Sequence, residues 1–251
     1  MLKKISFRTK CIGAAVAAAA TVLLYIGNTH IGTTYITVDS ENIPSAFNGF
    51  KIAHISDLHN AEFGEGQSKL IEKIRESDPD IIVITGDMID SRRTDVEKAV
   101  ELVEGLGGEI PIYYVTGNHE SRVSEYSELE EKIVENGVNV LRNKNQSIEI
   151  DGSYINIIGV DDPAFGYSSD EMYDTITGLK GDSYNILLSH RPELFGMYIQ
   201  TGVDLVLSGH AHGGQVRIPF IGGLAAPNQG FFPKYTEGLY ENGGTSMIVS
   251  R

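Results

Sequence analysis

The sequence predicts an α/β domain built on a parallel sheet covered by helices, and two observations support this prediction. Strand-like and helix-like segments alternate between residues 50 and 116. Several strand-like segments also end in residues able to bind metals, such as Asp87 at the end of IIVITGD. In sheets of this kind, ligands bind at the carboxyl ends of the strands. We therefore expect the functional groups to collect along one edge of one sheet.

The elements of the first half follow from hydrophobic periodicity and from the glycines and prolines that end them. The run Ile81–Thr85 contains only apolar or β-branched residues, which is typical of a central strand covered on both faces. The segment 94–106 places its apolar residues on one stripe and ends at two glycines, which indicates a helix. The predicted series is strand 50–55, helix 67–77, strand 81–85, helix 94–106 and strand 112–116.

The pattern changes after residue 116. A helix is expected at 125–136, followed by short strands separated by turn residues, as in antiparallel hairpins. No internal repeat interrupts the chain, so we expect a single domain with two sheets. The remaining predicted elements are strand-like runs at 139–141, 147–150, 154–160, 186–190, 205–212 and 245–249, and helices at 169–177 and after Pro192.

Three segments are expected along the chain: a signal-anchor or transmembrane segment at 1–31, an extended lead-in at 32–49 and a catalytic domain at 50–251. Four basic residues precede Cys11–Ile31, which is 21 residues long and carries no charged side chain. A cleaved signal peptide and a membrane anchor both fit this pattern, with His30 at the membrane interface. The basic flank predicts an N-terminus in the cytoplasm and an extracytoplasmic or secreted body.

The charge of the chain is concentrated in its body. Four of the 20 basic residues and none of the 34 acidic residues precede Gly32, so residues 32–251 carry a net charge of −18. Such a surface repels nucleic acid, so no nucleic-acid partner is expected and a nuclease is disfavoured. The only cysteine, Cys11, lies in the N-terminal segment, which excludes an intramolecular disulfide and a thiolate metal site.

The candidate metal ligands follow strand-like segments and comprise three oxygen donors and four imidazoles. Asp57 and His59 lie two residues apart beyond a strand, a spacing that lets both reach one ion. A donor set of this kind suits Mn, Fe, Zn or Co. The seven candidates are Asp57, His59, Asp87, Asn118, His190, His210 and His212.

The motifs that carry these residues resemble the calcineurin-like metallophosphoesterase family. They are D-x-H at 57–59, G-D at 86–87, G-N-H-E at 117–120, a single histidine at 190 and G-H-A-H at 209–212. The resemblance implies a four-layer αββα sandwich, here with an N-terminal hydrophobic helix. GHAHGGQ and the hydrophobic segment are similar to the membrane-associated bacterial branch, in which some members cleave the pyrophosphate of an acylated sugar nucleotide such as UDP-diacylglucosamine.

The resemblance also implies roles for single residues. Two divalent metal ions are expected as cofactors, with Asp87 shared between them. The other ligands would be Asp57, His59 and His212 for the first ion, and Asn118, His190 and His210 for the second. His119 is then not a ligand but a catalytic residue, an acid or hydrogen-bond donor that faces the leaving-group oxygen.

The expected function is therefore hydrolysis of a phosphoester or pyrophosphate bond by a hydroxide that bridges the two ions. The substrate would be a phosphorylated small molecule or a lipid-linked molecule, with monoester, diester and pyrophosphate all left open. The alternative is a metal-binding regulatory or scaffold protein without catalysis. That alternative gives His119 no physical role, which speaks against it.

Other polar residues are expected outside the site. His54 lies within a predicted strand, where a hydrogen-bonded core histidine is more usual than a ligand. Asp90, Asp161 and Asp162 could orient metal ligands by hydrogen bonds, but acidic loop residues in so acidic a protein are usually solvated, so all three are left outside the site. Glu120 stands where the family commonly has aspartate, and we expect this difference to be tolerated because that carboxylate is not a metal ligand.

The segment Gln215–Gly238 is rich in apolar residues, glycine and proline and directly follows two predicted ligands, so we expect it to form one wall of the substrate pocket. Its aromatic residues fit contact with an acyl chain or a base, and they fit a place in the core equally well. Similar family members continue beyond the final predicted strand, so the sequence is expected to be truncated after Arg251. The aromatic residues in question are Phe220, Phe231, Phe232 and Tyr235.

The N-terminal segment yields a direct prediction about topology. A reporter fused after Arg251 should behave as extracytoplasmic, because the basic flank holds the N-terminus in the cytoplasm. Reporter activity in intact cells measures this. A reporter active only in the cytoplasm would contradict the predicted orientation.

Overall fold

The computed structural model describes residues 6–215, 217–218 and 222–251. The chain divides into two compact units, residues 1–34 and 35–251. The first unit contains helix α1, Phe7–Thr29. Within the described residues, no helix combines the length and hydropathy required to cross a membrane.

The first sheet of the second unit is entirely parallel and has the strand order β1-β2-β3-β4. Its strands are β1 Ile52–Ile55, β2 Ile81–Thr85, β3 Ile112–Val115 and β4 Asn139–Val140. Helices join the strands as crossovers of the length that parallel pairing requires. They are α2 Ser68–Glu76, α3 Val96–Leu106 and α4 Tyr126–Glu135.

The second sheet is mixed and has the strand order β13-β14-β8-β7-β6-β5. Its four inner strands are parallel, while β13 and β5 pair antiparallel at the two edges. The strands are β5 Lys144–Ile150, β6 Ser153–Gly159, β7 Tyr184–Leu188, β8 Leu205–Ser208, β13 Gly238–Asn242 and β14 Thr245–Val249. Helices α5 Ser169–Leu179 and α6 Phe195–Thr201 accompany this sheet.

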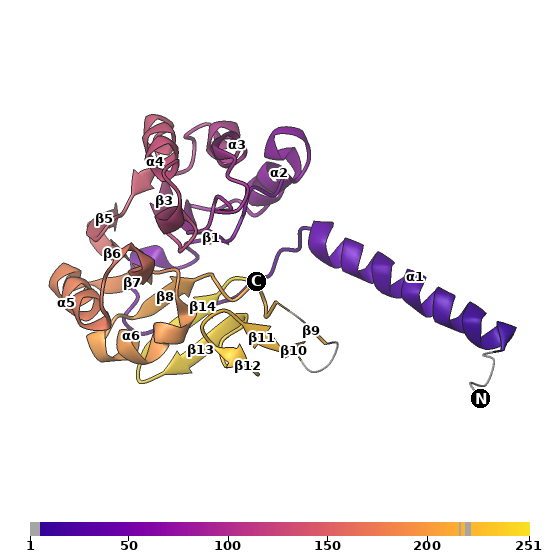
Figure 1. Ribbon diagram of the computed structural model, residues 1–251. Coiled ribbons are helices and arrows are strands. Elements are labelled where there is room, and N and C mark those ends of the chain that lie inside the picture. Colours follow the sequence, from indigo (N-terminus) through magenta and orange to yellow (C-terminus); the bar gives the residue numbers. More distant parts are fainter. Residues whose placement is uncertain (1–5, 216, 219–221) are drawn as a thin grey trace. The chain divides into compact units, whose positions relative to one another are not determined.

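Three hydrophobic clusters separate four layers (Figure 1). Alternate residues of β2 point to opposite faces: Ile82 packs under helices α2–α4, whereas Val83 packs between the two sheets. The second sheet repeats this alternation, since Leu205 faces the first sheet and Val206 faces α5 and α6. The predicted αββα sandwich is therefore confirmed.

Short-range signals explain several helix ends. Helix α3 ends at Gly107, whose φ of 69° is the left-handed conformation that glycine adopts without strain. Helix α5 begins with a capping box in which Ser168 and Glu171 satisfy each other's backbone amides. Single 3-10 turns occupy Ser45–Phe47, Glu65–Gln67, Glu120–Arg122, Pro163–Phe165 and Pro192–Leu194.

Some predicted elements differ in the structure. Strand β4 was expected to belong to an antiparallel hairpin, but it pairs parallel with β3 because helix α4 supplies the crossover. Strand β5 begins at Lys144 and not at Ser147, since pairing with β6 continues through polar residues on an exposed edge. Four two-residue strands in the segment after His212 were not predicted: β9 Arg217–Ile218, β10 Gly222–Gly223, β11 Ala225–Ala226 and β12 Gly230–Phe231.

His54 lies in β1 as a partly buried residue, and its Nε2 shares a hydrogen bond of 2.8 Å with Thr85 Oγ1. It is not among the residues that the structure groups as possible metal ligands. Burial lowers the pKa of His54 to about 4, although the carboxylate of Asp57 opposes the shift. The folded chain therefore binds this proton more weakly than the unfolded chain does.

This difference predicts acid sensitivity. The free energy of unfolding should fall as the pH drops from about 6.5 to about 4, because the unfolded state takes up the proton first. His54→Gln should reduce that loss by on the order of 1–2 kcal/mol near pH 4.5. Urea denaturation of metal-free wild type and variant near pH 7 and near pH 4.5 measures the difference. Equal acid losses in the two proteins would contradict the assignment.

Candidate functional site

The site lies where strands β1, β2, β3, β7 and β8 end, and the chain turns sharply at each of these points. Five of the seven predicted ligands have left-handed backbone angles, with φ values between 46° and 65°. Non-glycine residues rarely adopt this conformation, which concentrates at functional sites. The five residues are Asp57, His59, Asp87, His210 and His212.

Close backbone approach brings these loops together. A Cβ on Gly117 would lie 2.2 Å from Asp87 Oδ1, and one on Gly209 would lie 1.8 Å from Ser56 Oγ. Only glycine fits at either position. The loop after β3 therefore packs directly on the loop after β2, and the loop after β8 packs on the loop after β1.

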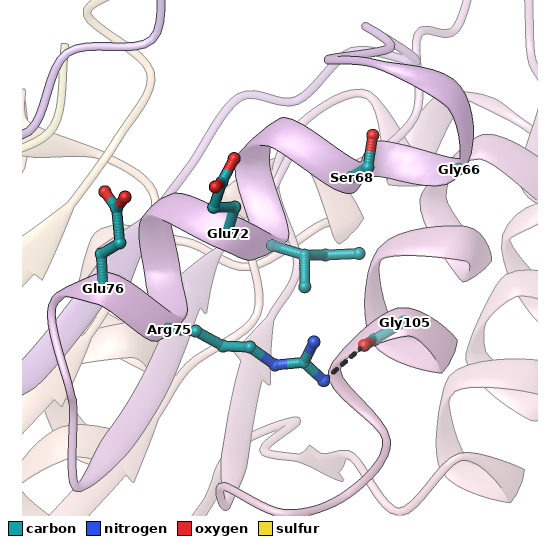
Figure 2. A pocket seen from close by; sticks show the side chains of 7 residues that line it. Gly66, Ser68, Glu72, Arg75, Glu76 and Gly105 are labelled. Atoms are coloured by element: carbon teal, nitrogen blue, oxygen red, sulfur yellow. Dashed lines mark hydrogen bonds between the residues drawn. The ribbon is translucent and has the colours of Figure 1, made fainter.

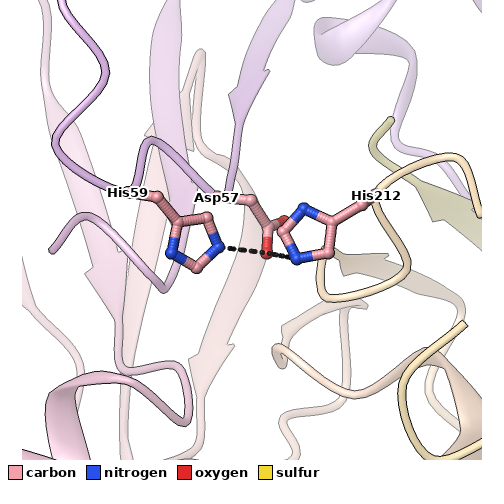
Figure 3. Close-up of side chains that lie close together, drawn as sticks. All are labelled: Asp57, His59 and His212. Atoms are coloured by element: carbon pink, nitrogen blue, oxygen red, sulfur yellow. Dashed lines mark ion pairs between the residues drawn. The ribbon is translucent and has the colours of Figure 1, made fainter. Parts of the chain in front are cut away.

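The first ligand group contains Asp57, His59 and His212, whose donor atoms lie within 4.8 Å of one another. Figure 3 shows both imidazoles directed at the Asp57 carboxylate. The Nε2 atoms of His59 and His212 each lie 3.7 Å from Asp57 Oδ1. The other carboxylate oxygen, Oδ2, accepts the backbone N–H of His210 at 2.9 Å. Oδ1 is thus left to face the two histidines.

The second ligand group contains Asp87, His190 and His210, all buried. His190 Nε2 lies 3.2 Å from Asp87 Oδ2 and 3.1 Å from His210 Nδ1. His190 Nδ1 bonds to the carbonyl oxygen of Thr85 at 2.6 Å, which keeps a proton on Nδ1 and directs Nε2 into the site. Asp87 joins the groups, because its Oδ2 is also 3.6 Å from His59 Nε2.

Charges within the site keep both carboxylates ionised. Burial alone would raise the pKa of Asp57, but the neighbouring imidazoles, led by His59, lower it to about 2. The same holds for Asp87. Burial would raise the pKa of Asp87, but the attraction of His190 outweighs burial and lowers this pKa well below its ordinary value. The converse holds for His190, whose pKa rises to about 10 because the attraction of Asp87 exceeds the cost of burial.

The donor atoms fit a metal centre. Within the described part of the chain, Asp57 Oδ1, both ring nitrogens of His59 and Asn118 Oδ1 are buried without a hydrogen-bond partner. Burying unpartnered polar atoms is costly unless another group completes them. Asn118 lies between Gly117 and His119, both of which contact Asp87. The structure thus brings all seven predicted ligands to one place, and their binding of metal stays a prediction.

His119 lies beside both groups, and its ring forms a third possible ligand group with His59 and Asp87. Its backbone N–H donates to Asp87 Oδ1 at 2.8 Å, and its Nε2 lies 4.0 Å from Asp87 Oδ2. The backbone N–H of Ser91 donates to His119 Nδ1 at 3.0 Å, so the neutral ring carries its proton on Nε2. Burial of the ring is the main reason that the pKa of His119 is lowered. The neutral ring therefore offers an N–H donor to the site.

Glu120 is a positioning residue whose role the sequence did not reveal. Its buried carboxylate accepts backbone N–H groups from Asp87 at 3.0 Å, Met88 at 2.8 Å and Gly117 at 2.8 Å. It thereby fixes the loop after β2 against the loop after β3. Burial and the nearby Asp87 raise the pKa of Glu120 to about 7. The spacing of G-N-H-E contains no signal for this contact, because the partners are backbone amides.

The interpretation of Asp161 and Asp162 as solvated residues was wrong. They are 2% and 1% exposed and follow β6 at the same edge as the ligands. Asp161 accepts hydrogen bonds from Thr116 and Arg142, both at 3.0 Å. Their position directly after a predicted strand could have indicated that they lie at the same edge as the ligands, whereas their residue type alone could not.

Asp162 binds the buried guanidinium of Arg191, whose Nη1 donates to His210 Nε2 at 3.0 Å. These two residues form a support behind one of the predicted ligands. Asp90, the third aspartate left outside the site, is partly exposed and its Oδ1 lies 3.7 Å from His119 Nδ1.

A surface cavity of about 430 Å³ lies elsewhere, between helix α2 and the end of helix α3 (Figure 2). Arg75 crosses it to donate to the carbonyl oxygen of Gly105 at 3.1 Å. None of the residues lining it is a predicted ligand. The cavity is therefore separate from the candidate metal centre.

Among the four aromatic residues of the predicted wall, three are described. Tyr235 packs on Phe195 and Tyr240 in the core of the second sheet. Phe231 and Phe232 are 83% and 76% exposed. Phe220 lies outside the described residues.

Comparisons with known proteins agree with this geometry. Residues 50–214 match the family described as calcineurin-like phosphoesterase. The chain is 35% identical over 226 residues to the uncharacterized metallophosphoesterase YkuE of Bacillus subtilis (strain 168), covering 88% of this chain and 78% of YkuE. It is 30% identical over 200 residues to the transmembrane protein with metallophosphoesterase domain of Bos taurus, covering 73% and 45%. TT1561 of Thermus thermophilus shares the fold with a TM-score of 0.55 at 12% identity, covering 80% of this chain and 88% of that one.

The hydrogen bonds from three backbone N–H groups to the Glu120 carboxylate lead to a prediction. Glu120→Gln should lower the free energy of unfolding by about 2–3 kcal/mol, because the new NH₂ group would face backbone N–H donors. It should also weaken Mn²⁺ binding, since Asp87 would lose its fixed position. Chemical denaturation and equilibrium dialysis measure the two effects.

The matched control is Glu131→Gln, which makes the same change on an exposed face of α4. It should alter stability by less than about 0.5 kcal/mol. Similar results for the two variants would remove the positioning role of Glu120.

Proposed function

The chain belongs to the calcineurin-like phosphoesterase family and is a phosphoester hydrolase; we propose that it uses two divalent ions to cleave a phosphoester or pyrophosphate bond. The observation that carries the proposal is the set of buried ligand atoms without partners around one shared carboxylate, Asp87. The Asp87 carboxylate lies near histidines of both groups, His59 and His190, an arrangement that suits a pair of ions better than a single ion.

The residues that would hold the ions are the two groups described above, with Asp87 added to the first and Asn118 to the second. When bound, divalent ions supply activation of water and neutralisation of phosphate charge. Mn, Fe, Zn and Co all remain compatible with the donor set of oxygen and imidazole. The ligands proposed for the first ion are Asp57, His59, Asp87 and His212, and those for the second are Asp87, Asn118, His190 and His210.

His119 supplies the remaining chemistry. With Nδ1 accepting the N–H of Ser91, the Nε2 proton is directed toward the side of the site occupied by Asp87. A donor there stabilises negative charge as it develops on the leaving-group oxygen. The ring keeps this proton, because deprotonating a neutral imidazole would require far more energy than donating a hydrogen bond. His119 therefore acts as a hydrogen-bond donor to the leaving oxygen.

Two exposed aromatic side chains support an apolar component in the substrate. Phe231 and Phe232 belong to the segment that directly follows His212, and large exposed apolar groups mark interaction sites. Phe232 also has a φ of 56°, a strained angle for a bulky residue. We propose a lipid-linked or acylated substrate, of which a sugar nucleotide of the UDP-diacylglucosamine type is one example.

Membrane anchoring is the proposed localisation, with the catalytic domain outside the cytoplasm. The uncharged run Cys11–Ile31 and its basic flank support it. The relative from Bos taurus, which is called a transmembrane protein, also supports it. The reporter fusion after Arg251 tests this proposal.

His119 gives the experiment that tests the proposed function. The Mn²⁺-loaded protein should hydrolyse an aryl phosphodiester, an alkyl phosphodiester and a lipid-linked sugar nucleotide, and chelation should abolish turnover. His119→Ala should retain both ions while turnover falls by about 10²–10⁴. The loss should be greater for the alkyl ester, whose leaving oxygen carries more charge without a donor.

The paired readouts are metal stoichiometry by elemental analysis and kcat on each ester. Equal losses on the aryl and alkyl esters would remove the donor role. Loss of an ion from the variant would make His119 a ligand, and a wild-type protein that binds no ions would end the two-ion proposal.

A further inference from the structure

The arginines of residues 35–251 divide into two sets. Five form ion pairs with carboxylates in the described part of the chain, which is the expected outcome on a surface with a net charge of −18. The other three, Arg92, Arg93 and Arg122, are exposed and have no ion-pair partner among the described residues. In so acidic a protein, three guanidinium groups without a carboxylate at the same place call for a physical explanation.

All three arginines lie on the two loops that contact His119 or carry it. Arg92 follows Ser91, whose N–H binds the imidazole of His119. The side-chain amide of Asn60, next to the ligand His59, donates to the carbonyl oxygen of Arg93. The loop that carries the pair Arg92-Arg93 is thus attached to the site at two points.

Arg122 reaches the same place from another loop. Its backbone N–H donates to the carbonyl oxygen of His119 at 3.1 Å, in the turn Glu120–Arg122. Two loops, after β2 and after β3, therefore carry these three arginines close to His119 along the chain.

The nearest carboxylate does not neutralise this charge. Asp90 Oδ1 accepts the backbone N–H of Arg92 at 2.7 Å and lies 3.7 Å from His119 Nδ1, so it faces the loop and the imidazole. No ion pair joins Asp90 to any of the three guanidinium groups within the described residues. The arginines contribute no ion-pair stabilisation to the fold, which leaves them available for a ligand.

We propose that Arg92, Arg93 and Arg122 form a subsite for a second anionic group, located on the part of the substrate that departs. The inference rests on the proposed function, since His119 marks the side of the leaving oxygen. Guanidinium groups bind phosphate and carboxylate through paired N–H donors. The substrate class is then a phosphodiester or pyrophosphate whose leaving group carries a further phosphate or carboxylate.

The test uses two methyl aryl phosphodiesters that differ only in the departing phenol. One phenol carries a para-phosphonate and the other an uncharged para-acetyl group. The Mn²⁺-loaded full chain should have a kcat/KM at least about tenfold higher for the phosphonate ester. In Arg92→Gln/Arg93→Gln and in Arg122→Gln, the ratio of the two kcat/KM values should fall by about tenfold or more.

The matched control is Lys69→Gln/Lys144→Gln, which removes the same charge as the double arginine variant. Both lysines are exposed and have no ion-pair partner among the described residues, and neither loop of the subsite contains them. This variant should keep the wild-type ratio. A fall equal to that of the arginine variants would show that only net charge matters and would overturn the subsite.

A binding measurement separates the subsite from the catalytic proposal. The para-phosphonate phenol, which is the product of the reaction, should bind to the wild-type protein after its metal has been removed by a chelator. Its dissociation constant, measured by isothermal titration at low salt, should be about tenfold lower for wild type than for either arginine variant. Such binding supports the subsite even if no ester is hydrolysed, a result that would end the proposed function instead. Equal binding by wild type and variants, or an unchanged kcat/KM ratio, would overturn the inference.

Discussion

The carboxylate of Glu120 is the contact on which the geometry of the site depends. Two parallel strands deliver Asp87 and Asn118 to the same edge, but strands alone do not fix the loops that follow them. Glu120 does so by accepting amides from both loops, in a buried position where an unsatisfied donor would be costly. The left-handed backbone at Asp87 is held in place by the same contact.

Around this contact, the two sheets contribute different parts of the site. The first sheet supplies Asp57, His59, Asp87 and the loop with His119, and the second supplies His190, His210 and His212. Alternating apolar residues between the sheets, such as Val83 and Leu205, keep the two strand edges together. Removing a buried residue of that interface would therefore disturb ligands that it does not touch, because their distances depend on the packing of both sheets.

The sequence predicted what depends on local pattern and on short motifs. Periodicity located the strands from Ile52 to Val115 within one or two residues, and strand ends indicated which polar residues would meet. Contacts to backbone atoms and between distant loops have no such pattern. The amides bound by Glu120 and the pairing of Asp162 with Arg191 belong to this kind, as does the parallel pairing of β4. The sequence left open whether Tyr235 and Phe231 belong to the core or face a substrate. In the structure Tyr235 packs against the core and Phe231 is exposed.

Among the described residues between His212 and Tyr235, several contacts join parts of this segment to one another. Gly214 lies against Gly223 and the N–H of Phe232 donates to the carbonyl oxygen of Leu224, whereas Tyr235 packs on Phe195 in the second sheet's core. Exposed positions in this segment, such as Phe231, contribute little to the stability of the fold. Sequence drift there would change the surface offered to a substrate and leave the ligands untouched. Homologous enzymes can thus keep one reaction centre while their substrate ranges diverge through this segment.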